Sequence, residues 1–416
     1  MDNLASKVSG DRTIWVVTII LSVVSLLVVY SASGSLSFAS KGSSAEYYLL
    51  KHGLITLAGL ALMYGVHKIP YRKFANVSLY ILLLAIILLV FTLFSDTSIN
   101  EAKRWIKIPI IGITFQTSEL AKVALIAYVA RELHRRQDLL RSFKNGFVFV
   151  LWPVIVVALL ILPGNFSTSA LILLVSFMMF MVGRVYWKHL LALMLAGIML
   201  MTSVIVIGKN FPKVFPRAAT WNERITAFLE PKPQDVEARL ADPDDFQQEQ
   251  ARIAIANGGL LGLGPGKSVQ RNFLPSAYSD FIFAIFIEEY GLLGGIFLVL
   301  LYLILLYRGI AIAVRSNTVF SSLLAFGITF SIIVNAYVNM AVAVGIGPVT
   351  GQTLPLMSMG GTSVWFTCLM LGMLQSVARG GEAPETLSFV DVAGHEEMSG
   401  EENDLADAEN LKQEAV

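Results

Sequence analysis

The sequence predicts an all-α integral membrane protein with about ten transmembrane helices and one large extracytoplasmic loop. Hydrophobic residues make up 55% of the 416 residues, charged residues make up 15%, and the mean hydropathy is +0.67. Soluble domains carry about 25% charged residues. Four long stretches contain no Asp, Glu, Lys or Arg at all, namely 14–40, 74–95, 145–183 and 316–378.

The individual spans follow from the requirement of about 20 mostly apolar residues for each membrane crossing. Pro163-Gly164-Asn165 divides the run 145–183, and Gly345–Pro355 divides the run 316–378. The predicted spans are 14–33, 47–66, 75–94, 113–131, 147–162, 168–183, 189–207, 281–307, 318–341 and 356–377. A signal peptide has an apolar region of only about 7–15 residues, so the first segment is interpreted as a retained span.

The distribution of basic residues predicts the orientation. Ten spans place both termini on one side, and with that side inside, the short inner segments hold fifteen Lys and Arg residues and the short outer loops five. By the positive-inside rule, both termini are cytoplasmic and the long loop 208–280 is outside. The predicted parts are an N-terminal segment 1–13, a membrane domain 14–378 and a cytoplasmic tail 379–416.

Charge and cysteine content exclude several classes of function. The net charge of +1 gives no basic excess for a nucleic acid. The single cysteine, Cys368, excludes an intrachain disulfide and a CxxC site, and the five histidines lack metal-ligand spacing. Eleven acidic residues against Lys412 after Gly381 predict a disordered tail, which is either simply solvated or a docking segment for cytoplasmic partners.

Charged residues at membrane depth are costly and usually functional. Glu119 and Lys122 are three residues apart on the fourth span, so they share a helix face and can pair. Asp280 opens the eighth span at its outer edge, and Glu288 and Glu289 follow on that span. The alternatives are a structural ion pair for Glu119 and Lys122, and a helix N-cap for Asp280.

The outer loop contains the glycine-rich segment 258–266, followed by Lys267 and Arg271. No strand precedes this segment and it faces outward, so it is not a dinucleotide fingerprint. It is either a plain hinge or a flexible backbone that holds a phosphate or pyrophosphate beside two cations. The apolar residues from Phe211 to Leu229 predict short amphipathic surface helices, and 246–257 predicts a helix.

A second polar region comprises Gly345–Pro355 and Ser358–Ser363, which are rich in glycine and hydroxyl groups. Irregular backbone at membrane depth requires surrounding protein or a wet cavity. Asn335 and Asn339 precede it on one helix face. We interpret the region either as a polar cavity that opens outward or as a set of helix-packing contacts.

Several of these motifs match one family. The segment Leu274–Ala284 followed by Glu288-Glu289-Tyr290-Gly291 resembles a signature of the SEDS proteins (shape, elongation, division, sporulation). Four further segments resemble SEDS motifs in the same order: Lys103–Ile106, Gln116–Lys122, Arg224–Pro231 and Pro348–Ser363. The resemblance extends from about residue 14 to 378 and implies the ten-span fold of that family.

The resemblance implies a peptidoglycan glycosyltransferase that polymerises lipid II on the outer face of the cytoplasmic membrane. Its donor is a glycan on undecaprenyl pyrophosphate, and its partner is a class B penicillin-binding protein. Asp280 is then expected to be the catalytic carboxylate, as general base for the attacking hydroxyl. The other expected substrate-binding or functionally sensitive residues are Arg104, Glu119, Lys122, Lys267, Arg271, Ser358, Gly360, Gly361 and Ser363. A divalent cation, Mg²⁺ or Mn²⁺, could assist the departure of the pyrophosphate, but the sequence does not identify ligands for it.

Among the subgroups, Tyr30–Leu36 and Asn165–Thr168 are most similar to division-type members of the Bacteroidetes group, which act at the septum, and the rod-elongation type is the close alternative. Thr117, Ser276 and Met359 depart from the usual family residues. Asn165 replaces a frequent aspartate, so that aspartate is not an essential base or cation ligand here.

Two other functions share these features. A lipid II flippase requires polar groups at mid-membrane that are reachable from both sides. A non-catalytic scaffold would only recruit the transpeptidase. The informative polar residues cluster near the outer face, which favours the polymerase.

Overall fold

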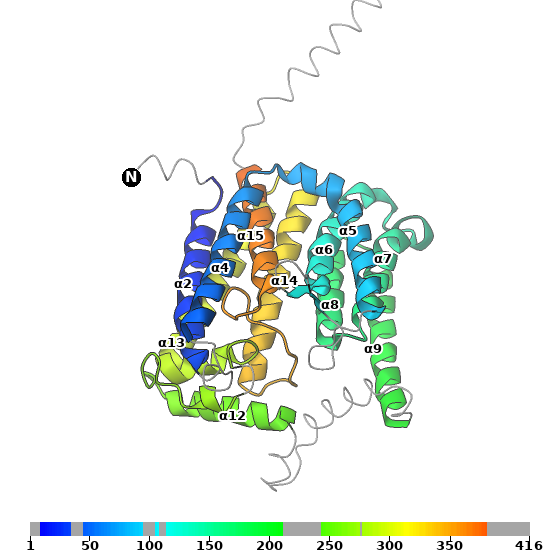
Figure 1. The fold of residues 1–416 in the computed structure, drawn as a ribbon. Helices are drawn as coiled ribbons and strands as arrows, with labels where there is room; N and C mark the ends of the chain where they lie inside the picture. The colour runs from blue at the N-terminus through cyan, green and yellow to red at the C-terminus, as the bar shows by residue number, and fades with distance from the viewer. Residues whose placement is uncertain are drawn as a thin grey trace, which may run out of the picture. The chain divides into compact units, whose positions relative to one another are not determined.

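A computed structural model describes residues 9–34, 45–94, 105–107, 114–210, 243–274 and 277–380 (Figure 1). Within these ranges, a helix forms at each of the ten predicted spans. The helices are α2 (Arg12–Ala32), α4 (Ala45–His67), α5 (Tyr71–Phe94), α6 (Thr117–Arg135), α7 (Val148–Ile161), α8 (Phe166–Val182), α9 (Trp187–Asn210), α13 (Ile282–Arg315), α14 (Val319–Ala343) and α15 (Thr362–Gly380). The prediction of a helical multi-pass membrane protein is confirmed.

Helix composition reflects position in the bundle. Within the described residues, six helices are long and apolar enough to cross a membrane, α8 and residues 187–199 of α9 are shorter apolar helices, and α6 and α15 are less apolar. Most side chains of α6 and α15 are buried against neighbouring helices. A helix surrounded by protein does not need an apolar lipid-facing stripe, so these two can carry polar groups.

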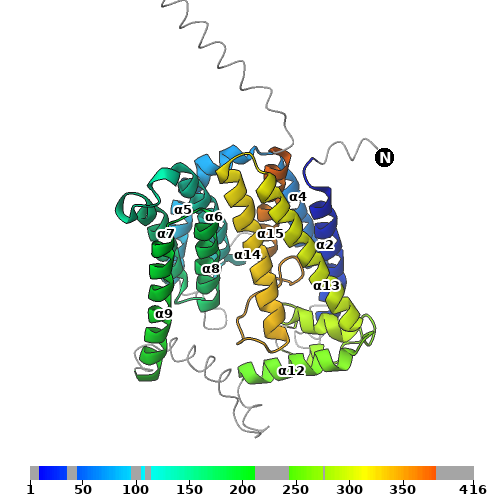
Figure 2. The same ribbon diagram turned by 180° about the vertical axis from the view of Figure 1, so that it is seen from behind.

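The two ends of the described chain lie at the same end of the bundle, which we call the termini end. There Gln375 of α15 bonds the backbone of Asp11, Arg379 donates to Lys68 O at 2.9 Å, and Tyr71 stacks on Phe320. At the opposite end, which we call the Asp280 end, α12 (Pro243–Gly258) runs across the helices (Figures 1 and 2). Asp280 lies there, as the alternation of spans predicts.

Several boundaries differ from the prediction; α13, for example, ends at Arg315 instead of residue 307. Strand β1 (Trp105–Lys107) pairs antiparallel with β2 (Thr114–Gln116), so α6 begins at Thr117 instead of residue 113. The last helix begins at Thr362 instead of residue 356, because Leu354–Gly361 forms turns. Helix α12 begins three residues before the predicted 246. Short η1 (Gln137–Leu139), η2 (Phe143–Phe147) and η3 (Gln270–Asn272) complete the described elements.

Helix α13 is broken at Gly291, whose φ of 72° and ψ of −176° are not helical. The glycine-rich segment after α12 supplies the missing partners: Leu263 N donates to Glu288 O at 2.9 Å, and Leu292 N donates to Gly259 O at 2.9 Å. A Cβ on Gly262 would lie 2.2 Å from Glu289 O, so only glycine permits this approach. The segment therefore packs against the α13 backbone, a role that neither the hinge nor the phosphate interpretation included.

Some predictions lie outside the described residues. They are Arg104, the amphipathic helices between Phe211 and Leu229, the motif Arg224–Pro231, Ser276 and the acidic tail after Gly380. Residues up to Gly380 group into one compact unit, separate from 381–416.

Candidate functional site

Asp280 lies in the short turn that precedes α13. Its side chain is partly exposed, and Ser279 Oγ donates to Asp280 Oδ1 at 2.8 Å. The N-cap residue of α13 is Phe281, so the structure does not support the alternative of Asp280 as that helix's N-cap. The main-chain oxygen of Asp280 accepts from Asn339 Nδ2 at 2.8 Å. The aspartate is thus held through its backbone while its carboxylate remains partly accessible.

The turn before α13 is bound on its other side by the loop that precedes α15. Ser358 Oγ donates to Ser279 O at 2.6 Å, and Met359 N donates to Tyr278 O at 3.0 Å. Burial, with smaller contributions from Tyr48 and Asp280, raises the pKa of Tyr278, so its hydroxyl stays protonated at neutral pH. The predicted residues Asp280 and Ser358 therefore belong to one cluster.

The remaining predicted loop residues shape the same turn. Ser363 N donates to Gly360 O at 3.2 Å, and Ser363 Oγ accepts from Thr353 Oγ1 at 3.4 Å. Gly361 has a φ of 58°, the left-handed region that glycine adopts without strain. Gly360, Gly361 and Ser363 thus set the loop's path into α15.

Two asparagines of α14 hold the beginning of this loop. Asn339 Nδ2 donates to Gln352 O at 2.6 Å in addition to Asp280 O, and Asn335 Nδ2 donates to Thr353 O at 3.2 Å. Gln352 Nε2 in turn donates to Thr168 Oγ1 at 2.9 Å. These bonds join α8, α14 and the turn of Asp280. The asparagines bind carbonyls of this loop and of the Asp280 turn.

Glu119 and Lys122 form the ion pair that their spacing predicts. Lys122 Nζ lies 2.8 Å from Glu119 Oε2, and each side chain is only 8% exposed. Helix α6 is surrounded by α5, α7, α8, α14 and α15. Its N-terminus is joined to that of α15, since Gln116 N donates to Thr362 Oγ1 at 3.2 Å. The pair therefore lies inside the bundle, on the helix whose start is bonded to the start of α15.

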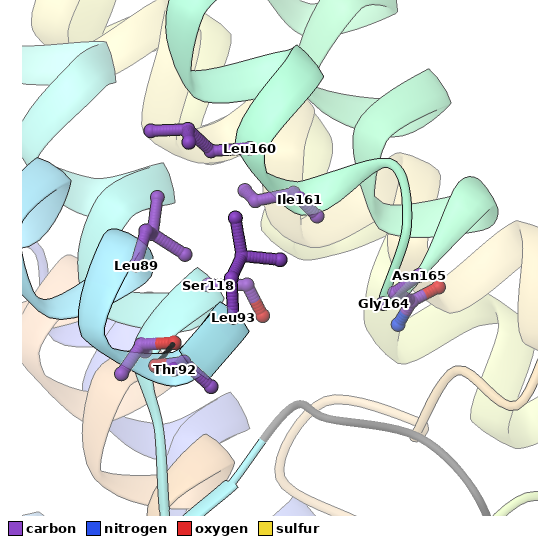
Figure 3. Close-up of a pocket in the computed structure, with 9 residues that line it drawn as sticks. Leu89, Thr92, Leu93, Ser118, Leu160, Ile161, Gly164 and Asn165 are labelled. Carbon is purple, nitrogen blue, oxygen red and sulfur yellow. Dashed lines mark hydrogen bonds between the residues drawn. The ribbon is translucent and has the colours of Figure 1, made fainter. Parts of the chain in front are cut away.

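A small cavity lies between α5, the start of α6 and the α7–α8 turn (Figure 3). Apolar side chains line one part, and Thr92, Thr117, Ser118 and Asn165 line the other. The cavity has about 20 Å³, room for about one water molecule. It is too small for a sugar, so it is not the substrate site in this conformation.

The two predicted cations of the outer loop have different surroundings. Lys267 is exposed. Arg271 Nη1 donates to both Ser31 O and Ser31 Oγ at 3.0 Å, and Ser31 Oγ donates to the Glu289 carboxylate. Arg271 therefore joins the outer loop to the end of α2 and to α13.

Glu288 has a separate structural role. Its carboxylate accepts from Ser268 Oγ and from the backbone N–H of Val269 and Gln270. No group of three His, Cys, Asp or Glu side chains within the described residues has the arrangement of a metal site. We therefore assign no step of the chemistry to a divalent cation.

Sequence reasoning missed Gln352 and Thr168 as partners of the site. A lone amide in a glycine-rich loop is a weak signal, and its partner lies 184 residues away in sequence. The capping role of Asn165 was also missed; its side chain caps α8 by accepting from Thr168 N at 3.1 Å.

Comparison with known families decides the relationship. A family model described as "Cell cycle protein", which unites FtsW, RodA and SpoVE, matches residues 11–382. The chain belongs to this family. The SEDS resemblance of the motifs is thereby confirmed at the level of the family.

Curated relatives align with most of this chain. The chain is 33% identical over 374 residues to a probable peptidoglycan glycosyltransferase FtsW of Geobacter sulfurreducens, covering 88% of this chain and 95% of that protein. It is 31% identical over 380 residues to the stage V sporulation protein E of Bacillus subtilis, covering 90% and 98%.

Solved structures share the fold. A chain of a peptidoglycan synthase complex superposes with a TM-score of 0.72 at 24% identity, covering 90% of this chain and 99% of that one. The rod shape determining protein RodA of Thermus thermophilus gives a TM-score of 0.62 at 22% identity, covering 90% and 98%. The chain thus shares its fold with these two proteins.

Proposed function

We propose that this protein is a peptidoglycan glycosyltransferase that polymerises lipid II, with Asp280 as its catalytic base. Family membership and the FtsW relatives support the reaction. The observation that carries the assignment of Asp280 is its arrangement. Its main chain is fixed by Asn339, its turn is fixed by Ser358, and its carboxylate is partly accessible at the end of the bundle.

The reaction requires activation of a weak nucleophile. A sugar hydroxyl of lipid II attacks the anomeric carbon of a glycan on undecaprenyl pyrophosphate, and Asp280 accepts its proton. Attack from the face opposite the pyrophosphate inverts the anomeric configuration, through a transition state of oxocarbenium character as in glycoside hydrolysis. The bond to the pyrophosphate oxygen breaks as the new glycosidic bond forms.

The leaving pyrophosphate accumulates negative charge that cations can stabilise. We propose Lys267, Arg271 and Arg104 for this role. Lys267 is exposed, while Arg271 is held by Ser31 and would act from that position or after release. Glu119 and Lys122 are proposed as functionally sensitive residues inside the bundle. The loop before α15 is proposed to shape the acceptor site, through Ser358, Gly360, Gly361 and Ser363.

The proposed setting is the cytoplasmic membrane, with both termini in the cytoplasm and the Asp280 end in the periplasm. The inner segments' excess of basic residues supports this orientation. The proposed partner is a class B penicillin-binding protein, supported by the fold's likeness to a chain of a peptidoglycan synthase complex. We propose a division role at the septum and a Bacteroidetes-type lineage, from the FtsW relatives and from the segments Tyr30–Leu36 and Asn165–Thr168.

The test is polymerisation in vitro. Wild type, Asp280→Ala and Asp280→Asn are purified, each with and without the cognate transpeptidase, and supplied with lipid II; glycan polymer is read on a gel. We expect polymer from the wild type and none from either variant. The matched control is Asp138→Asn, an equal charge change at an exposed residue of η1, which should polymerise normally.

Polymer from Asp280→Ala would contradict the catalytic assignment. Lack of polymer from every protein, with labelled lipid II crossing a proteoliposome bilayer instead, would establish the flippase. A fluorescent fusion at midcell or along the side wall would separate the division role from the elongation role.

A further inference from the structure

A buried histidine outside the proposed chemistry is linked through Ser25 to the loop that precedes α15. His52 of α4 is fully buried, and its Nε2 lies 2.7 Å from Ser25 Oγ of α2. Ser25, also fully buried, donates through Oγ to Met357 O at 2.8 Å. Met357 directly precedes Ser358, the residue that binds the turn of Asp280.

The hydrogen bonds determine the form of the histidine. A serine hydroxyl has one proton, and that of Ser25 is directed at Met357 O. Ser25 Oγ must therefore accept from His52, which places the ring proton on Nε2. The other nitrogen, Nδ1, is buried and has no hydrogen-bond partner among the described residues. A neutral ring with its proton on Nε2 satisfies this arrangement.

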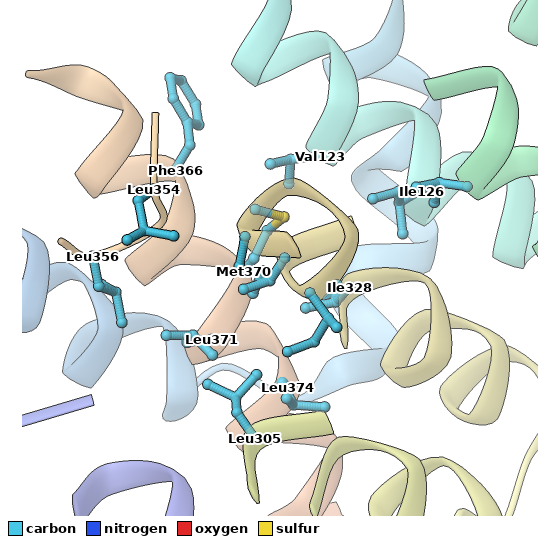
Figure 4. Packing of buried hydrophobic residues seen from close by; sticks show 14 of the residues in the cluster. Val123, Ile126, Leu305, Ile328, Leu354, Leu356, Phe366, Met370, Leu371 and Leu374 are labelled. Atoms are coloured by element: carbon cyan, nitrogen blue, oxygen red, sulfur yellow. The ribbon is translucent and has the colours of Figure 1, made fainter. Parts of the chain in front are cut away.

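The turn that Ser25 holds has an unfavourable backbone. Leu356 has a φ of 64°, in the left-handed region that side chains other than those of Gly, Asn and Asp rarely adopt. The carbonyls on both sides of it are bound: Pro355 O accepts from Tyr302 OH at 2.5 Å, and Met357 O accepts from Ser25. Figure 4 shows Leu354 and Leu356 among the buried core residues, which include Leu371. The surrounding structure thus enforces this conformation.

We propose that His52 and Ser25 are positioning residues for Asp280. His52 orients the Ser25 hydroxyl, Ser25 fixes Met357, and the fixed turn aims Ser358 at the carbonyl of Ser279. Neither side chain contacts Asp280, so they act on the placement of the base and not on the binding of lipid II. The inference rests on the proposed function and adds two residues of α2 and α4 to it.

The experiment measures steady-state polymerisation of lipid II by the purified protein with its cognate transpeptidase. We expect Ser25→Ala and His52→Leu to lower kcat about tenfold, because misplacing a reacting group by about 1 Å costs up to about 100-fold. KM for lipid II should stay within about twofold, as expected for an effect on the chemical step alone. His52→Gln should recover most of kcat, since its amide N–H can donate to Ser25 from the same place.

The two residues act through one chain of bonds, so the combined variant should be no slower than the slower single variant. The matched control is Thr56→Val, one turn along α4, because Thr56 Oγ1 is buried and has no hydrogen-bond partner in the part of the chain that the structure describes. It should behave like the wild type. If His52→Leu does not fold, Ser25→Ala and His52→Gln decide the question.

Unchanged kcat in Ser25→Ala, a change in KM alone, or additive losses in the combined variant would overturn the proposal. Asp280→Ala is assayed in parallel. If that variant polymerises, the proposed function fails; if it is inactive while Ser25→Ala is normal, only the positioning role fails.

Discussion

At the termini end, Arg308 of α13 pairs with Asp11 through a 2.7 Å bond from Nε, and Gln375 of α15 bonds the backbone of Asp11 in both directions. At the Asp280 end, Asn339 donates to Gln352 O and Ser358 donates to Ser279 O, while the Gln352 side chain donates to Thr168 Oγ1 of α8. The first arrangement joins helices to one another. The second fixes irregular backbone around a partly accessible carboxylate.

The difference is between polar groups that join helices and polar groups that fix the turn of the proposed base. Asp11 is only 6% exposed, and its oxygens are used by Arg308 and by the N-cap bonds to Thr13 and Ile14. Asn339 and Ser358 bind the main chain of the turn, and the Asp280 side chain, which accepts from Ser279, is partly exposed. Placement of a base by its backbone is what preorganised catalysis requires.

The sharpest way to test this contrast is the pair Glu119–Lys122, a buried ion pair on the helix whose start is bonded to the start of α15. Glu119→Gln leaves Lys122 without its partner inside the bundle, and removing one member of a buried pair costs about 3–5 kcal/mol. We expect a large fall in thermal stability in detergent and loss of polymer. The combined variant Glu119→Gln/Lys122→Met has no charge at this buried position and should recover stability.

Polymerisation should remain low in that combined variant, because charged groups at membrane depth usually serve function. If polymer returned together with stability, the pair would belong with Asp11–Arg308 as a purely structural contact.

The sequence predicts the helices well because their signal is local. An apolar run long enough to cross a membrane forms a helix whatever its neighbours, since its backbone groups must be satisfied internally. The Glu119–Lys122 pair was predictable for the same reason, as both residues lie on one turn. Asp280 could be identified from the sequence by its motif and by its charge at a span boundary.

The missed features depend on contacts between distant segments. The break at Gly291 lies within the predicted span 281–307 and was not predicted, because its cause is the approach of Gly258 and Gly262 from another segment. The bond of Ser25 to Met357 spans 332 residues. The strand 114–116 was included in the predicted span 113–131, and its pairing with 105–107 makes the helix begin later, at Thr117.

A smaller effect is expected where the glycine-rich segment supports the helix that follows Asp280. Gly262→Ala would place a Cβ 2.2 Å from Glu289 O at a φ of 82°. Gly266→Ala is the matched control, since its φ of 76° is equally unfavourable but nothing lies within 4 Å of the added carbon. Left-handed backbone costs an alanine about 1–2 kcal/mol.

We therefore expect Gly266→Ala to lose about that amount of stability and to polymerise normally. Gly262→Ala should lose more stability and most of its activity, because the α13 segment next to Asp280 must shift. Thermal unfolding and the polymer gel measure both quantities. Equal effects of the two substitutions would show that backbone strain alone matters and that the docking of this segment does not support the site.

The smallest effect is expected at the termini end. Asp11→Asn removes the charge opposite Arg308 but keeps the N-cap, because asparagine caps helices as well as aspartate does. The Arg308 side chain is 33% exposed, and an ion pair this accessible contributes about 0.2–1 kcal/mol. Thermal stability should fall slightly and polymerisation should be unchanged. Asp11→Ala also removes the cap and should cost about 1 kcal/mol more. A loss of polymer in Asp11→Asn at near-normal stability would mean that the termini end influences the chemistry, and the contrast between the two ends would have to be abandoned.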